Sequence, residues 1–478
     1  MMFFGSMAQE STAACQYSAG ERFSKRFEGK VAVITASTKG IGLDTARRFA
    51  LEGAKVVICS RKQTNVDEAV RTLHNEGLNV TGLVCHAAKK DDREKLLNEA
   101  EKLGGIDILV ANAAVNPVPG PIFECTESVW DKIFDTNLKS TFFLIKESLP
   151  LIKKRQGGSI ILMASHAAYD PISKIGIYGV SKTALLGLTK TMANELAEYN
   201  IRVNCVAPGY VDTDFVQIVV IAFLASKDAD YITGEIVIMT GGWSSRLIGL
   251  DTARRFAQEG AKVVISSRKQ KNVDEALKTL NNEGLDVKGL VCHVAKKDDR
   301  DKLLNEAEKL GGIDVLVMNA AVNPVPGPAV ECNEGVWDKI FDTNLKSTFF
   351  LAKESLPLMQ KRQGGSIIIM SSQSAYVPVR KIGIYGISKT ALLGLTKTMA
   401  DELAEYNIRV NCVAPGYVDT TFVQILLEDM TKVLSRIPMG RIGGPRDVSG
   451  VIAFLASKDA GYITGETILI TGGMTSRL

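Results

Sequence analysis

Apolar and polar positions follow two periods along the chain, and these periods predict strands and helices in regular succession. Residues 31–35 (VAVIT) form a continuous apolar, β-branched run, which is typical of a strand buried on both faces. A Gly-bearing turn and a stretch at helical spacing follow, and the alternation continues. We predict strands at 31–35, 55–59, 80–85, 107–111, 159–164, 201–207 and 235–239, and helices at 41–52, 66–75, 91–103, 128–154 and 176–198. This pattern predicts an α/β fold with a Rossmann-type, doubly wound parallel sheet.

The chain also repeats itself. Matching pairs, 207 positions apart and later 231 apart, are Ile41/Ile248, Arg61/Arg268, Tyr178/Tyr385 and finally Leu247/Leu478. The first copy therefore lacks 24 residues that the second has, at about 426–450. The second copy in turn lacks everything that matches residues 30–40. A repeat of about 200 residues is a domain duplication, because solenoid units are much shorter.

These boundaries predict three segments. Residues 1–27 are rich in small polar residues and are expected to be a flexible leader. Residues 28–247 form the first copy and residues 248–478 the second, both incomplete. No linker rich in proline, glycine or serine separates the two copies, although independent domains usually have one.

Composition excludes several classes of protein. The net charge is only +4, without a block of like charges, so a nucleic-acid groove is not expected. The longest apolar run, residues 218–225, is far shorter than the roughly 20 residues that span a bilayer. The eight cysteines show no CxxC pair and no His/Cys cluster, so no metal site is expected.

The turn after the first strand is the first candidate for chemistry. Its cofactor-binding candidates are Thr35, Ser37, Thr38, Lys39, Gly40, Ile41 and Gly42. Glycines there let the backbone approach a pyrophosphate, which the N–H groups of a helix N-terminus stabilise. A Gly-rich turn alone is weak evidence, but its position between a buried strand and a helix favours a dinucleotide.

The end of the second strand suggests which dinucleotide binds. Ser60, Arg61 and Lys62 stand where NAD-binding folds usually carry an acidic residue for the ribose 2′-hydroxyl. Arginine instead accommodates a 2′-phosphate, so the pattern favours NADPH/NADP over NAD. A solvated basic pair at a helix start is the alternative interpretation.

Tyr178 and Lys182, four residues apart, share one face near the start of a predicted helix. We expect the lysine ammonium to lower the pKa of the phenol, so that the phenol can pass a proton to a carbonyl oxygen. Ser165 follows the fifth strand at the edge where ligands bind in such sheets, and its hydroxyl is expected to donate to the same oxygen. A Tyr-x-x-x-Lys pair alone occurs often by chance; the combination with Ser165 is more specific.

Together these residues resemble the short-chain dehydrogenase/reductase family over both copies. The resemblance implies catalytic tetrads of Asn137, Ser165, Tyr178 and Lys182 in the first copy and Asn344, Ser372, Tyr385 and Lys389 in the second. It implies further cofactor contacts from Asn112, Ala113, Tyr178, Lys182, Pro208, Gly209, Val211 and Thr213. In the family the lysine also holds the nicotinamide ribose, the asparagine anchors a proton-relay water, and members are usually homo-oligomers.

Finer motifs, such as TASTKGIG and SKTALLGLTKT, resemble a peroxisomal branch of NADPH-dependent carbonyl and retinal reductases. The resemblance implies reduction of small apolar aldehydes and ketones. It also implies recognition of Ser476, Arg477 and Leu478 by the peroxisomal import receptor; the alternative location is cytoplasmic. Two other functions stay open: a 3-oxoacyl reductase of the same family, and a catalytically impaired NADPH-binding fusion protein.

The two truncations predict different defects. The first copy lacks the family's substrate lid, so we expect it to bind NADPH but to hold ketones loosely. The second lacks the central strand and the phosphate turn, and is expected to be inactive unless these are supplied. Two arrangements would supply them: residues 30–218 join the lid and last strand of the second copy, or residues 236–242 imitate its first strand and turn.

Overall fold

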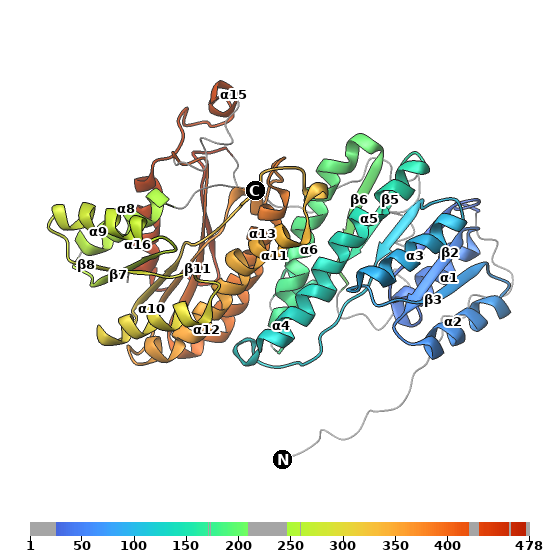
Figure 1. Cartoon of the computed structure of the whole chain (residues 1–478), viewed down its shortest axis with the longest axis horizontal. Helices are drawn as coiled ribbons and strands as arrows, with labels where there is room; N and C mark the ends of the chain where they lie inside the picture. The colour runs from blue at the N-terminus through green and yellow to red at the C-terminus, as the bar shows by residue number, and fades with distance from the viewer. Residues whose placement is uncertain are drawn as a thin grey trace, which may run out of the picture.

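The computed structural model describes residues 25–170, 172, 174–208, 246–258, 260–419, 430–457 and 460–474. In the first copy, parallel strands form one sheet in the order β3-β2-β1-β4-β5-β6 (Figure 1). The strands are β1 (Val31–Ile34), β2 (Lys55–Ser60), β3 (Val80–Val84), β4 (Ile108–Ala111), β5 (Gly158–Met163) and β6 (Ile201–Val206). Val33 pairs with Val57 on one side and with Leu109 on the other, so β1 is central. The doubly wound parallel sheet is thus confirmed.

Helices cover both faces of this sheet. They are α1 (Gly40–Leu51), α2 (Gln63–Asn75), α3 (Lys90–Lys102), α4 (Glu127–Phe134), α5 (Ser140–Lys154) and α6 (Gly176–Leu196), with short turns η1 (Ile122–Glu124), η2 (Asp135–Lys139), η3 (His166–Ala168) and η4 (Ala197–Tyr199). Phe49 of α1 packs in one buried cluster with Ile34. Phe142 of α5 packs on the opposite face with Val33. Adjacent residues of β1 therefore point into different cores, which is why the whole strand is apolar.

The long helical stretch predicted at 128–154 is present as α4, η2 and α5 in direct succession. Thr126 caps α4 by accepting a hydrogen bond from the Val129 N–H at 3.3 Å, and η2 is a π-helical segment between α4 and α5. The wider turn rotates Asn137 into the interior, where it is fully buried. Such π-segments are frequent at functional sites.

In the second copy the strands form two separate sheets. Four strands run in the order β12-β11-β10-β9, and β7 pairs with β8. The strands are β7 (Val263–Ser267), β8 (Val287–Val291), β9 (Val315–Met318), β10 (Gly365–Met370), β11 (Ile408–Pro415) and β12 (Thr467–Ile470). Among the described residues nothing occupies the position of β1, as the sequence match predicts.

Helices also alternate with the strands of the second copy. They are α8 (Arg246–Gln258), α9 (Gln270–Asn282), α10 (Lys297–Lys309), α11 (Glu334–Phe341), α12 (Ser347–Gln360), α13 (Gly383–Leu403), α15 (Met430–Leu434) and α16 (Pro445–Ala456), with η6 (Ala329–Glu331), η7 (Asp342–Lys346), η8 (Gln373–Ala375) and η9 (Ala404–Tyr406). The last strand, β12, pairs with β11 of its own copy. The hybrid unit in which this strand completes the first copy is therefore not formed. The first copy's own last strand, predicted at 235–239, lies outside the described residues.

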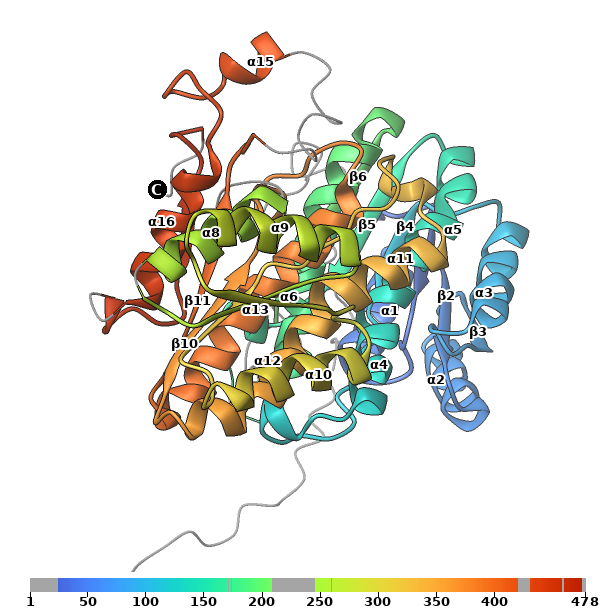
Figure 2. The same cartoon turned by 60° about the vertical axis from the view of Figure 1, so that its left-hand side comes forward.

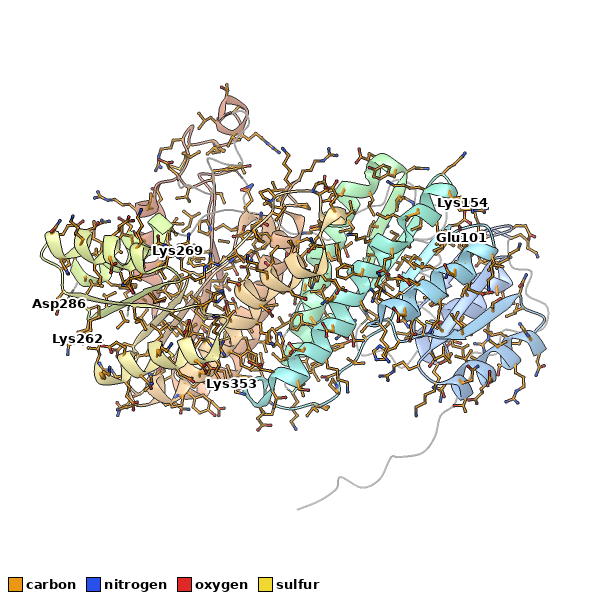
Figure 3. All side chains as sticks on the ribbon, viewed as in Figure 1. Glu101, Lys154, Lys262, Lys269, Asp286 and Lys353 are labelled. Atoms are coloured by element: carbon orange, nitrogen blue, oxygen red, sulfur yellow. The ribbon has the colours of Figure 1, made fainter. Side chains whose placement is uncertain are left out.

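The two copies pack against each other through α6 and α13, which lie side by side in both views (Figures 1 and 2). The polar contacts come in reciprocal pairs. Lys139 reaches Asp338 at 2.8 Å, and its counterpart Lys346 reaches Asp131 at 2.8 Å. Lys353, at the junction of the copies in Figure 3, donates to the Cys125 carbonyl at 2.9 Å. This reciprocity is the signature of a two-fold, isologous interface, here within one chain.

Aromatic side chains form the apolar part of this interface. Trp130 stacks on Phe349 with ring centroids 4.9 Å apart, and the counterpart Trp337 stacks on Phe142 at 4.7 Å. All four rings are buried. Aromatic pairs of this kind contribute roughly 0.5–1.5 kcal/mol beyond the area they bury. One continuous core therefore crosses from one copy to the other.

None of the helices described combines the length and apolarity that a membrane crossing would require. Within the same residues no His, Cys, Asp and Glu side chains gather as a metal site would need. The seven described cysteines are free thiols, and all but Cys205 are buried.

Candidate active site

The predicted site of the first copy lies where the strands of its sheet end. The turn after β1 is tied to the end of β4 by Thr35 and Asn112. The Thr35 hydroxyl accepts hydrogen bonds from the backbone N–H groups of Asn112 and Ala113, each at 3.0 Å. The Asn112 amide donates to the carbonyls of Thr35 and Ala36 at 3.1 and 3.0 Å. These four bonds fix the turn at the carboxyl edge of the sheet.

Ser37 joins the turn to two strands. Its hydroxyl donates to the Ile34 carbonyl at 2.6 Å and accepts from the Cys59 N–H at 3.1 Å. The side chain is fully buried. The Ser37 N–H also donates to the Cys59 carbonyl at 3.0 Å, so both the hydroxyl and the backbone N–H of this residue are engaged within the fold. Thr38 is buried as well, while Lys39 is exposed.

The turn brings helix α1 close to Asn112. An added Cβ at Gly42 would lie 2.7 Å from both the Ala36 carbonyl oxygen and the Asn112 amide nitrogen, so only glycine fits. Gly40 has a φ of +52°, a region that favours glycine, whereas Ala36 adopts φ +50° without being one. The predicted glycine positions thus have a backbone reason for their identity.

The N-terminus of α1 suits an anion. No side chain caps it, and its first turn holds no acidic residue. The first N–H groups of a helix have no partner within the helix and carry the positive end of its dipole. Gly40, Ile41 and Gly42 therefore present the chemistry that a pyrophosphate needs.

Positive charge collects at the ends of β2 and β3. Arg61 and Lys62 are exposed after β2, next to the half-buried Ser60. Burial lowers the pKa of His86, and the charges of Arg61 and Lys89 lower it further. His86 Nδ1 is buried and has no hydrogen-bond partner among the described residues. Arg61 and Lys89 therefore offer positive charge to an anion at this edge of the sheet. Lys89 was missed at the sequence level, although its place just after β3 was a usable signal.

Ser165 and Tyr178 meet at the end of β5. The Ser165 hydroxyl accepts from the Ala167 N–H at 3.2 Å and is hydrogen-bonded to the Tyr178 phenol. Burial raises the pKa of Tyr178, and the bond to Ser165 only partly offsets this effect. The pKa of Tyr178 is therefore raised and not lowered as the sequence analysis expected, because burial has the largest effect.

Lys182 lies fully inside the protein. Its ammonium donates to the Met163 carbonyl at 2.6 Å and stands 5.4 Å from the centroid of the Tyr178 ring. Burial lowers the pKa of Lys182 to about 8. The ammonium is therefore mostly charged at pH 7, close to the phenol but not bonded to it.

Asn137 holds the site together from η2. Its side chain accepts from the Val115 N–H at 2.7 Å and donates to the Val115 carbonyl and to the Ser181 hydroxyl, both at 3.0 Å. Ser181 donates in turn to the Tyr178 carbonyl at 2.7 Å. Asn137 therefore connects the loop after β4 to the tyrosine's helix. Ser181 was missed by sequence reasoning, although it lies between the two predicted catalytic residues.

The second copy repeats this geometry but not its access. Asn344 bonds Val322 and Ser388 as Asn137 bonds Val115 and Ser181. The Lys389 ammonium donates to the Met370 carbonyl at 2.6 Å, and Ser372 is hydrogen-bonded to Tyr385. Tyr385, however, is only 5% exposed, packed with Ile382, Val379 and Tyr417, whereas Tyr178 is half-buried.

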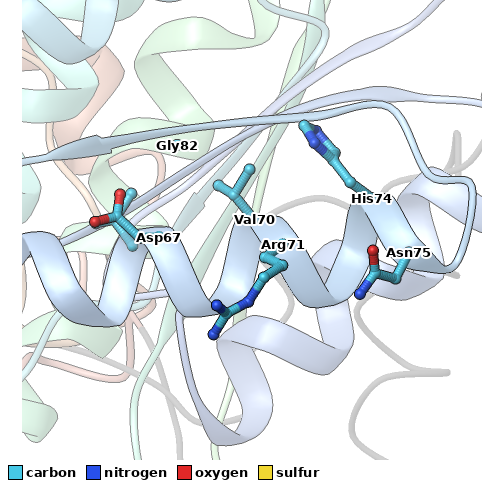
Figure 4. Close-up of a pocket in the computed structure, with 7 residues that line it drawn as sticks. Asp67, Val70, Arg71, His74, Asn75 and Gly82 are labelled. Carbon is cyan, nitrogen blue, oxygen red and sulfur yellow. The ribbon is translucent and has the colours of Figure 1, made fainter.

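Three predicted cofactor contacts, Gly209, Val211 and Thr213, lie outside the described residues. Pro208, just before them, accepts a hydrogen bond from the His166 N–H at 2.8 Å, which places it beside Ser165. A hollow of about 460 Å³ opens elsewhere, between α2 and β3, lined by residues such as Arg71, His74 and Gly82 (Figure 4). It contains none of the predicted site residues.

Comparison with known proteins finds relatives of both copies. The family model described as short chain dehydrogenase matches residues 30–220, and one described as enoyl-(acyl carrier protein) reductase matches residues 245–475. Dehydrogenase/reductase SDR family member 4 of Bos taurus is 53% identical over 235 residues, 48% of this chain and 84% of the relative. Its Homo sapiens namesake is 50% identical over 253 residues, 52% of this chain and 90% of the relative.

A solved gluconate 5-dehydrogenase from Burkholderia cenocepacia, in complex with NADP and tartrate, is 31% identical, with a TM-score of 0.46 over 48% of this chain and 92% of its own. The curated relatives are about half identical over most of their own length. The chain therefore belongs to the short-chain dehydrogenase/reductase family of nicotinamide-dependent oxidoreductases.

Proposed function

We propose that the first copy reduces small apolar aldehydes and ketones with NADPH. The observation that carries this proposal is the hydrogen-bonded Ser165–Tyr178 pair, held at the end of β5 with a buried lysine ammonium one turn further along. A carbonyl oxygen placed before the pair would accept hydrogen bonds from both hydroxyls. The relatives' names, dehydrogenase/reductase, support the same class of reaction.

The turn after β1 would hold the cofactor. The N-terminus of α1 would bind its pyrophosphate, and Arg61 with Lys89 would bind the 2′-phosphate that distinguishes NADPH from NADH. When bound, NADPH supplies a hydride for the carbonyl carbon. The lack of a carboxylate at positions 60–62 supports this choice of cofactor.

The proton for the carbonyl oxygen would come from Tyr178. Burial raises the pKa of its phenol, which keeps the proton on the tyrosine until negative charge develops on the substrate. Ser165 would stabilise that charge by donating its own hydrogen bond. Lys182, charged and 5.4 Å from the ring centroid, would stabilise the phenolate that remains.

The second copy would not share this activity. It has the counterparts of the four catalytic residues, but its sequence lacks the match of residues 30–40, and Tyr385 is packed against Val379 and Tyr417. We also propose peroxisomal import through Ser476–Leu478, which lies outside the described residues, and assembly of chains into an oligomer.

Turnover of an aromatic aldehyde with NADPH tests this function directly. Tyr178→Phe removes the proton donor, and we expect kcat to fall by about 10²–10⁴-fold with unchanged NADPH affinity. Tyr385→Phe is the matched control and should leave kcat unchanged. Wild-type chain that binds NADPH without turnover would identify an impaired fusion protein, and preference for acyl thioesters would identify a 3-oxoacyl reductase.

A further inference from the structure

The second copy holds the far end of the loop that follows β4 in the first copy. The Glu402 carboxylate, on α13, accepts the backbone N–H of Ile122, at the start of η1, at 2.8 and 3.0 Å. Lys353, on α12, donates to the Cys125 carbonyl just after η1 at 2.9 Å. Ile122 is only 1% exposed, so an unpaired N–H at this position would be costly. The two bonds therefore hold η1 at both of its ends.

The near end of the same loop belongs to the active site. Val115 exchanges two hydrogen bonds with the Asn137 side chain, at 2.7 and 3.0 Å. Between the two ends, the Gly120 N–H donates to the Lys174 carbonyl at 2.7 Å, which ties the loop to the segment before α6. Ile122 lies only seven positions after Val115. The second copy and the tetrad asparagine therefore hold one short loop from opposite ends.

The start of α6 lies against the same part of α13. Gly176 is the first residue of α6 and precedes Tyr178 by two positions. An added Cβ at Gly176 would lie 2.4 Å from the Thr398 side chain and 3.5 Å from Glu402 Oε1. Only glycine lets the two helices approach so closely. The helix that carries the tyrosine therefore begins in contact with the second copy.

A third contact reaches the segment that begins with Ser165. Ser165 caps η3 at its start, and Tyr169 follows its last residue. The Lys397 ammonium of α13 donates to the Tyr169 carbonyl at 3.0 Å. The contacts from positions 397, 398 and 402 span about one and a half turns of a single helix. One helix of the second copy therefore touches three segments of the first copy's site.

We propose that α13 of the second copy positions the active site of the first, with Glu402 as the main positioning residue. Its bond to Ile122 fixes the loop after β4 and, through Val115, the orientation of Asn137. The effect on turnover rests on the proposed function, whereas the effect on the loop does not. The second copy thereby supports a reaction that it does not itself carry out.

The same contacts also occur in the opposite direction, which supplies matched controls. Glu195 of α6 accepts the backbone N–H of Ala329 at 2.8 and 3.0 Å, and Lys190 donates to the Tyr376 carbonyl at 3.2 Å. These bonds hold the loop of the second copy, whose sequence lacks the match of residues 30–40. Removing them should weaken the interface in a comparable way and leave the site of the first copy untouched.

Turnover separates a positioning role from a purely structural one. Glu402→Ala removes the acceptor of the Ile122 N–H, and we expect kcat for an aromatic aldehyde to fall about 10–100-fold. NADPH affinity should stay unchanged, because the groups that would hold its phosphates follow β1, β2 and β3. Glu402→Gln keeps an acceptor oxygen and should restore kcat, and Glu195→Ala should leave kcat unchanged. An equal fall in Glu402→Ala and Glu195→Ala, or no recovery in Glu402→Gln, would overturn the inference.

A milder pair of variants gives an answer where Glu402→Ala fails to fold. Lys397→Met removes an exposed contact and should lower kcat about threefold or more, whereas Lys190→Met should leave it unchanged. Equal kcat values for these two variants would contradict a positioning role of α13.

Hydrogen exchange tests the positioning without any turnover. In Glu402→Ala the amide of Val115 should exchange at least about tenfold faster, with its counterpart Val322 unchanged, and Glu195→Ala should give the reverse. A wild-type chain that lacks turnover but shows these changes would refute the proposed function and support the positioning. Unchanged exchange at Val115 in Glu402→Ala would refute the positioning, whatever the activity.

Discussion

Glu402 provides a sharp test of the interface between the two copies. Its carboxylate, on α13, accepts the backbone N–H of Ile122 in the first copy at 2.8 and 3.0 Å. Burial raises the pKa of Glu402, the hydrogen bond from Ile122 opposes this, and neighbouring carboxylates such as Asp401 add to it. The resulting pKa is about 7. We predict that Glu402→Gln makes the stability of the chain less dependent on pH.

The direction of this pH dependence follows from the number of protons that the folded and unfolded chains bind. Between the ordinary pKa of 4.5 and about 7, the folded chain binds more protons at this site than the unfolded chain. Its stability therefore falls as the pH rises through this window. The pKa difference sets an upper limit of about 3 kcal/mol, and because the side chain is half-exposed, solvent screening reduces the expected effect to about 1–2 kcal/mol.

Urea unfolding at pH 5 and pH 8 measures the effect. The wild type should lose about 1–2 kcal/mol more than Glu402→Gln between these pH values, because the glutamine still accepts from Ile122 but does not ionise. Glu198→Gln, at an exposed carboxylate, is the control and should behave as the wild type. Equal pH dependence in the wild type and Glu402→Gln would refute the reasoning.

Three further predictions follow from the site and the chain end. Arg61→Glu should weaken NADPH binding at least about tenfold and spare NADH, whereas Arg268→Glu in the second copy should change neither; fluorescence titration measures both, and an equal loss for the two cofactors would contradict the assignment. Gly42→Ala should abolish NADPH binding and cost about 1–3 kcal/mol in urea unfolding, because the added Cβ would lie 2.7 Å from backbone and Asn112; unchanged binding would refute this. Removing residues 476–478 from a fluorescent fusion should move it from peroxisomes to the cytoplasm, as microscopy would show; retention in peroxisomes would exclude this signal.

The sequence predicted the sheet well because each strand of the first copy is a short apolar run followed by turn residues. It did not predict the π-helical segment around Asn137, since one wider turn leaves the helical spacing almost unchanged on both sides. The sequence also did not predict the raised pKa of Tyr178, because that pKa depends on how deeply the phenol is buried. It also depends on the position of the Lys182 ammonium, which donates its hydrogen bond to the Met163 carbonyl and not to the phenol.

The sequence did not predict the contacts between the copies, for a related reason. Glu195 and Glu402 read as ordinary surface carboxylates on helices, yet each accepts a backbone N–H from the other copy. A duplicated sequence shows that two copies exist, and the geometry that turns them into an intramolecular pair is set by packing across the long helices.

The central claim is that one chain contains one nicotinamide cofactor site, built by the first copy. Calorimetric titration of full-length chain with NADPH measures the number of sites directly. We expect one site per chain, lost in Gly42→Ala and retained in Gly249→Ala. Two sites per chain, or one site that survives Gly42→Ala, would contradict it.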